Sequence, residues 1–128
     1  MKEELIKVVL CKVGERAKVV TIPNDLETFQ RIVNDIISLF FIDDQHAIIC
    51  GDNSKIYGYP LNRCVFDEKH KPIEVIAGDF LIVDASDEDF KSLTSNDAVK
   101  LAKQYEWPED IFLVGNEIMS FPYDPAKW

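Results

Sequence analysis

The residue types best suited to chemistry meet in residues 56–63, where an aromatic segment runs into a proline and is followed by Asn62 and Arg63. A guanidinium beside an amide can hold a carboxylate or a phosphate through paired hydrogen bonds. Tyr57 or Tyr59 would then supply an aromatic wall on which a ligand could stack. Tyr57, Tyr59, Asn62 and Arg63 are therefore candidates for binding a small anionic ligand or a nucleotide.

The same segment also has a structural interpretation. Asn side chains in loops commonly satisfy the backbone of their own turn, and Arg side chains commonly pair with a carboxylate such as Asp79. Because both roles are ordinary, the sequence favours the structural role of Asn62 and Arg63 over ligand binding.

Catalytic motifs are missing from the sequence. It contains no GxSxG elbow, no phosphate-binding glycine loop and no HExxH pair. The adjacent carboxylates of Asp43-Asp44 and Asp87-Glu88-Asp89 resemble those of two-metal nuclease sites, but neighbouring acids are also common in turns. We therefore predict no catalytic residues and no cofactor, and lean toward a protein that is not an enzyme.

A zinc site is the one metal centre that the composition suggests. His46, Cys50, Cys64 and His70 are suitable ligand types, but they lack the short paired spacing of a zinc finger or ribbon. The third cysteine, Cys11, follows an apolar segment as Cys50 does, so the thiols are typical of small core residues in a reducing compartment. We predict neither a metal site nor a disulfide framework.

Net charge is the second informative property, and it is concentrated in one half of the chain. The total is −9; residues 1–63 hold nine acids and eight bases, and residues 64–128 hold fourteen acids and six bases. Nucleic acid is an improbable direct partner, because phosphate binding needs clustered Lys and Arg. An acidic surface favours basic proteins instead.

The acidic segment that follows residue 83 has two interpretations. Asp84, Asp87, Glu88 and Asp89 could imitate a row of phosphates and bind a nucleic-acid-handling protein. They could instead form an acidic surface that keeps a small protein soluble, and on charge alone this second interpretation is favoured. Both interpretations stay open at this point.

The elements that must position these residues begin with a hairpin and a helix. Residues 5–13 and 18–22 are rich in Val and Ile and predict two strands joined by a short turn. Asn24 is predicted to cap a helix with Glu27 as its reciprocal partner. The apolar stripe of this helix consists of Leu26, Phe29, Ile32, Val33 and Ile36.

Short strands dominate the rest of the chain. Residues 36–42, 46–50 and 55–59 predict a three-stranded meander. Further strands are expected over residues 64–66, 73–76, 80–83 and 111–114. A second helix is expected to be capped by the segment of residues 94–97 and stopped at Trp107-Pro108. Residues 120–128 are predicted to have no regular structure. This order of elements indicates an α+β fold, a mostly antiparallel sheet with two helices packed on it.

Length and hydropathy indicate one cytoplasmic domain over residues 1–128. The longest apolar run, residues 36–42, is too short to cross a bilayer. Two acids near the N-terminus are unlike the basic start of a signal peptide. No membrane association is expected, and the sequence leaves the oligomeric state open.

Three segments resemble successive landmarks of a family known as domain of unknown function 3846. They are residues 58–63, residues 76–83 and residues 90–94, and the start of the chain is similar as well. The resemblance covers about residues 5–105, so residues 106–128 form a C-terminal extension. Asn62 and Arg63 occupy the family's proline-x-Asn-Arg pattern.

The resemblance implies a biological setting but no activity. Members of this family occur largely in phages and other mobile elements of Gram-positive bacteria. We therefore expect a small acidic accessory protein that is non-catalytic and binds a basic host protein involved in DNA handling or defence. Binding of a small anionic ligand or a nucleotide at Asn62 and Arg63 is the alternative.

Overall fold

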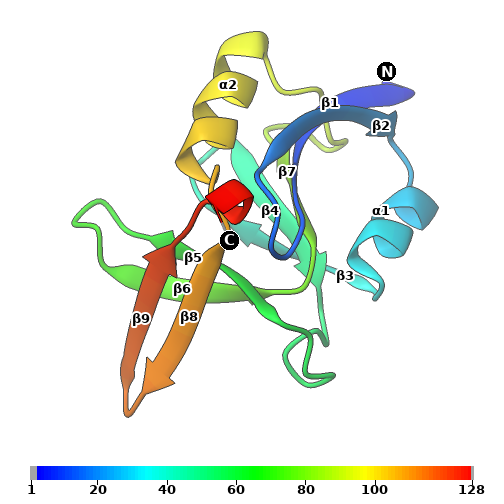
Figure 1. The fold of residues 1–128 in the computed structure, drawn as a ribbon. Coiled ribbons are helices and arrows are strands. Elements are labelled where there is room, and N and C mark those ends of the chain that lie inside the picture. Colours follow the sequence, from blue (N-terminus) through cyan, green and yellow to red (C-terminus); the bar gives the residue numbers. More distant parts are fainter. Residues whose placement is uncertain (1–2, 128) are drawn as a thin grey trace.

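The computed structural model describes residues 3–127, and its centre is a five-stranded antiparallel sheet. The strand order is β2-β1-β7-β4-β3 (Figure 1). The five strands are β1 (Leu5–Cys11), β2 (Lys18–Pro23), β3 (Ile37–Phe41), β4 (His46–Gly51) and β7 (Phe80–Asp84). The two helices are α1 (Leu26–Val33) and α2 (Ser95–Gln104). The predicted α+β fold is confirmed.

Two hairpins stand apart from this sheet. The first consists of β5 (Leu61–Phe66) and β6 (Pro72–Ala77), and the second of β8 (Glu109–Val114) and β9 (Glu117–Pro122). A single turn of 3-10 helix, η1 (Pro125–Lys127), follows. In Figure 1 the β8–β9 hairpin extends away from the two helices.

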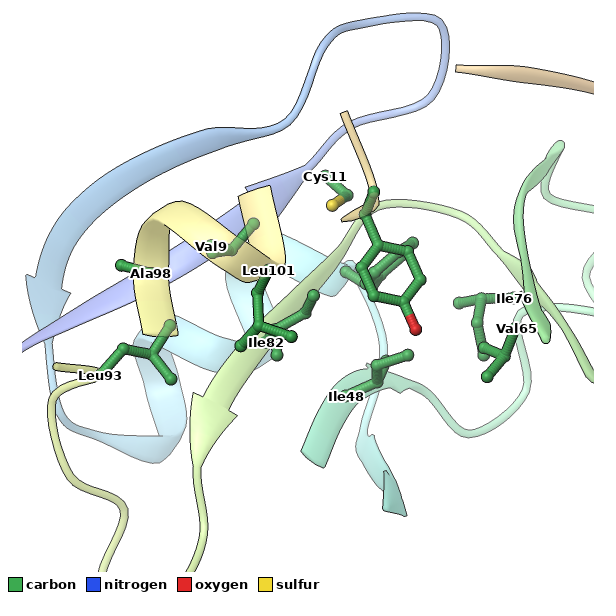
Figure 2. Packing of buried hydrophobic residues seen from close by; sticks show 11 residues of the cluster. Val9, Cys11, Ile48, Val65, Ile76, Ile82, Leu93, Ala98 and Leu101 are labelled. Atoms are coloured by element: carbon green, nitrogen blue, oxygen red, sulfur yellow. The ribbon is translucent and has the colours of Figure 1, made fainter. Parts of the chain in front are cut away.

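The sheet is buried on both faces because successive strand residues point to opposite sides. Ile6 and Val8 of β1 pack with Phe29 and Val33 of α1 on one face. Val9 on the other face packs with residues of α2 and of the β5–β6 hairpin. Figure 2 shows this second core, where Ala98 and Leu101 of α2 lie next to Val9 and Ile82, and Val65 and Ile76 lie beyond Ile48. The molecule therefore has three layers, with β7 buried along its whole length.

The first helix differs from its prediction at both ends. Its N-cap is Asp25, whose carboxylate accepts from the Thr28 amide at 2.8 Å. Asn24 is buried instead, and its side-chain amide donates to the carbonyls of Glu3 and Phe90. The helix ends at the left-handed Asn34, before Ile36. The prediction of Asn24 as the cap is wrong because a long-range contact uses its side chain.

The meander is only partly confirmed, because its third strand does not form. Residues 55–59 make turns in which the Tyr57 amide donates to Asn53 and the Gly58 amide donates to Lys55. Gly58 has a φ of 75°, which favours glycine. The neighbour of β4 is instead β7, which is about thirty residues farther along the chain. The pairing of β4 thus depends on a strand that is distant in the sequence, and local sequence patterns do not reveal such a partner.

The prediction of no regular structure over residues 120–128 is wrong for the described part of that range, because β9 extends into it and η1 follows. The expected strand over residues 111–114 is confirmed as part of β8, but β9 pairs with it over residues 117–122. The two-residue turn Gly115-Asn116 between two apolar segments is a recognised hairpin signal. None of the helices within residues 3–127 is long and apolar enough to span a membrane.

Candidate functional site

Asn62 and Arg63 lie side by side at the start of β5, and both side chains are buried. The Arg63 Nε donates to the Tyr105 carbonyl at 3.0 Å, and one terminal nitrogen donates to the Glu15 carbonyl at 2.7 Å. The other terminal nitrogen donates to the Asn62 Oδ1 at 2.6 Å. The guanidinium therefore joins the β1–β2 connection to the C-terminal end of α2.

Asn62 makes a second set of backbone contacts. Its side-chain nitrogen donates to the carbonyls of Cys11 and Gly78, at 3.0 and 2.8 Å. Asp79, which the structural interpretation named as a partner of Arg63, instead accepts from the Val13 amide. The pair thus satisfies four backbone carbonyls, two in the β1–β2 hairpin and one each at Gly78 and Tyr105. These contacts fit a structural role, with carbonyls in place of the expected carboxylate.

Burial also affects the electrostatics of the guanidinium. It lowers the pKa of Arg63 from its ordinary value, while Cys11, Glu109 and Tyr123 act in the opposite direction. Arg63 has no exposed surface, so an anion could reach it only if the surrounding carbonyls moved away. Ligand binding at this pair stays a prediction, and it requires such an opening.

The two tyrosines of the candidate set contact other elements. Tyr59 donates its hydroxyl hydrogen to the Asn34 carbonyl at 2.9 Å and accepts from the Asn34 side chain at 3.1 Å. Tyr57 is largely exposed, and its ring centroid lies 5.7 Å from that of Tyr59. These contacts fix the loop of residues 51–60 onto the C-terminal end of α1.

The acidic candidates divide into one buried and three exposed residues. Asp84 ends β7, is 8% exposed, and accepts from both the amide and the hydroxyl of Ser86. Asp87, Glu88 and Asp89 are exposed in the connection after it. Asp84 therefore shapes the turn that presents the other three.

The three exposed acids border a hollow of about 440 Å³. Its other lining residues include Glu3, Phe90 and Lys91. Lys91 pairs with Asp87 at 3.2 Å, and the hydrogen bond and charge of Asp87 raise the pKa of Lys91. Sequence reasoning missed Glu3 because long-range contacts place it at the hollow. Its carboxylate accepts from the Ser92 amide at 3.0 Å, across 89 residues of chain, and its carbonyl is joined to that of Phe90 by Asn24. The structure thus brings four carboxylates and one ammonium to one concave surface.

His46 is held between two carboxylates at the start of β4. Its Nδ1 lies 2.8 Å from the nearer Asp43 oxygen, and its Nε2 lies 3.2 Å from Asp97 in the first turn of α2. Burial raises the pKa of Asp43, but hydrogen bonds from the His46 ring and from the amides of Gln45 and His46 outweigh it and lower that pKa. Both ring nitrogens therefore lie within hydrogen-bonding distance of a carboxylate, which orients the ring between β4 and α2.

The other three residues that were weighed as possible zinc ligands, Cys50, Cys64 and His70, lie in ordinary packing environments. The His70 ring stacks on Phe66 with the centroids 4.5 Å apart. Cys64 is buried, and burial is the main cause that raises the pKa of its thiol to about 11. Cys50 is half-buried in β4. Within residues 3–127 no group of three or more His, Cys, Asp or Glu side chains is arranged so that it could hold a metal ion.

Comparison with known proteins identifies one family. The family model described as "Domain of unknown function (DUF3846)" matches residues 6–106. Searches of curated proteins and of solved structures found no match. The match includes the central sheet, both helices and the β5–β6 hairpin, but it ends before β8. Because the match extends over more than half of the chain, the chain belongs to the DUF3846 family.

Proposed function

We propose that the protein is a non-catalytic interaction module that binds a basic protein through the acidic hollow after β7. The observation that carries this proposal is the set of four carboxylates, Glu3, Asp87, Glu88 and Asp89, around one concavity that holds a single lysine. Such a concavity attracts Lys and Arg side chains and repels phosphates.

The proposed biological setting is the cytoplasm of a bacterial host, where the protein acts as an accessory factor of a phage or mobile element. Host proteins that handle DNA, including defence enzymes, have basic surfaces that bind phosphates. An acidic surface can occupy such a surface, and the net charge of −9 increases the rate at which the two proteins meet. Catalysis is not part of the proposal.

The experiment compares two variants that lose the same amount of charge. The first carries Asp87→Asn, Glu88→Gln and Asp89→Asn; the control carries Asp44→Asn, Asp52→Asn and Glu68→Gln, which are exposed acids elsewhere. Each protein is immobilised, incubated with host lysate at low and high salt, and washed. The proteins that remain bound are then identified and quantified.

We expect a basic partner that is retained by the wild type and the control but lost from the first variant. High salt should also release it, because exposed charges are screened. A partner that both variants retain equally, or lose equally, would show that the hollow is not the binding surface.

A further inference from the structure

One face of the β8–β9 hairpin is exposed to solvent and has a largely apolar centre. Residues that pair directly across the hairpin share a face, and the register pairs Asp110 with Phe121, Phe112 with Met119, and Val114 with Glu117. We name these six residues the outer face. All six are exposed, and the four apolar side chains range from 42% to 58% exposed.

The opposite face of the hairpin is turned toward the rest of the molecule. Ile118 and Ser120 line a cleft together with Phe66 of β5 and with Trp107. Glu109 accepts from the Cys64 amide at 3.0 Å and so attaches the hairpin to β5. The inner face therefore attaches the base of the hairpin to the rest of the molecule, although Leu113 near its tip is exposed, whereas the outer face is exposed along its whole length.

The composition of the outer face is typical of a binding surface. Phe112 and Phe121 form an edge-to-face pair with centroids 6.0 Å apart, and Met119 lies directly opposite Phe112. Aromatic residues and Met are enriched at protein interfaces, and contiguous exposed apolar patches often mark them. Asp110 and Glu117 flank the apolar centre at its two ends.

Charge identifies the kind of partner that fits. The two charged residues of the outer face, Asp110 and Glu117, are both acidic. Packing the outer face against that of a second copy would bring carboxylates together between two chains that each carry a net charge of −9. A surface with apolar side chains between Lys or Arg residues is complementary to it.

We propose that the outer face of the β8–β9 hairpin is a docking surface for a protein segment whose apolar side chains are flanked by lysine or arginine. The family match ends at residue 106, so this surface lies on the part of the chain outside the matched region. The inference rests on the proposed function only in that the partner is a basic protein, and it concerns a surface separate from the acidic hollow.

The test uses blocked peptides of about seven residues, which is the length of an ordinary strand. In the first peptide every second side chain is, in order, lysine, isoleucine, isoleucine and lysine, with serine between them. The second peptide replaces the lysines by glutamates, and the third replaces the isoleucines by serines. Each is added to the isotope-labelled full chain, and the amide resonances of residues 109–122 are followed.

We expect only the first peptide to shift the hairpin resonances. The combined variant Phe112→Thr and Met119→Thr keeps strand propensity and should raise the dissociation constant of that peptide at least about tenfold. The combined variant Asp110→Asn and Glu117→Gln leaves the apolar centre intact and should weaken the same peptide. The matched control is Phe41→Thr, because Phe41 is an equally exposed residue of β3, and it should have no effect.

Three results would overturn the proposal. The first is equal binding of the lysine and glutamate peptides, and the second is binding of the serine-substituted peptide with the same affinity. The third is a wild-type dimer in sedimentation velocity that Phe112→Thr with Met119→Thr dissociates, since a second copy would then occupy the face. Neutralising Asp87, Glu88 and Asp89 should leave hairpin binding unchanged, so failure of either proposal is seen separately.

Discussion

A buried guanidinium links parts of this protein that are far apart in the sequence. Arg63 contacts the backbone at Glu15 and at Tyr105, and through Asn62 it is connected to Cys11 and Gly78. A buried charge is costly to remove from water unless its hydrogen bonds are made, and here they are made by fixed carbonyls. The pair therefore contributes to stability through contacts that only a planar, multiply donating group can make.

Substitution of Arg63 by Lys separates the structural role from ligand binding. We expect Arg63→Lys to lower the free energy of unfolding by about 2 kcal/mol, because an ammonium cannot reach all three acceptors at once. Urea unfolding followed by tryptophan fluorescence measures this change in unfolding free energy. Arg31→Lys is the control, because Arg31 is exposed. Unchanged stability together with loss of phosphate binding would instead favour the ligand site.

The hydroxyl of Tyr105 gives a second prediction. It is buried and has no hydrogen-bond partner among the described residues, and burial is the main cause that raises its pKa. We expect Tyr105→Phe to leave stability unchanged or to raise it by about 1 kcal/mol, because an unsatisfied polar group is removed. Tyr59→Phe is the matched variant, and it should lower stability because it loses the bond to the Asn34 carbonyl. A clear loss of stability in Tyr105→Phe would mean that this hydroxyl has a partner.

The buried thiols predict how stability depends on alkaline pH. Burial is the main cause that raises the pKa of Cys11 to about 12 and that of Cys64 to about 11, from an ordinary 9.0. The folded state therefore holds the thiol protons more tightly than the unfolded state does. The contribution of the protonated thiols to the free energy of unfolding is fully present below about pH 9, and it is lost as the pH rises toward about 12. Cys11→Ala should make the decline of unfolding free energy over this range less steep. Equal slopes for wild type and variant in urea titrations would contradict it.

At the scale of elements, α1 shows how one side chain can be taken from a local role by a distant contact. Asp25 caps the helix, whereas Asn24 holds the carbonyls of Glu3 and Phe90. The local pattern predicted Asn24 as the N-cap, because Asn and Asp are both good N-cap residues and the two are adjacent in the sequence. The stripe is confirmed where Phe29 and Val33 pack in the core, but Leu26 in the first turn is exposed.

Two substitutions at this helix should differ in their effect. Asp25→Ala is expected to lower the free energy of unfolding by about 1 kcal/mol through loss of the cap. Asn24→Ala should cost about 2 kcal/mol, because two part-buried carbonyls lose their donor. Helix content by circular dichroism and urea unfolding measure both. A larger loss of stability for Asp25→Ala than for Asn24→Ala would show that the helix cap contributes more to stability than the long-range contacts of Asn24.

At the scale of the whole molecule, the chain consists of a family region and a hairpin attached to it. The β8–β9 hairpin contacts β5, where Glu109 accepts from the Cys64 amide, and the Tyr123 amide donates to the Pro108 carbonyl. The five-stranded sheet and its two cores are formed almost entirely by residues of the matched region.

Truncation after Trp107 tests this division. We expect the shortened chain to keep the dispersed amide spectrum of the sheet, because its core residues remain, but to lose about 1–3 kcal/mol of stability as the Cys64 amide loses its partner. The full-length Glu109→Ala variant should show a loss of similar size. A collapsed spectrum for the truncated chain would mean that the hairpin is part of one cooperative unit.

The sequence by itself determined which segments are strands or helices wherever a clear period and turn residues coincide. The hairpin of β1 and β2, a second helix starting within residues 94–97 and the α+β class were all predicted in this way. The tertiary structure alone decided that β7 lies between β1 and β4 and that Arg63 reaches Tyr105. It also decided that Glu3 joins the acidic hollow. The periodicity of apolar residues reflects only interactions between residues close together in the sequence. Strand order and buried polar contacts depend instead on which segments, distant in the sequence, pack against each other and exclude water.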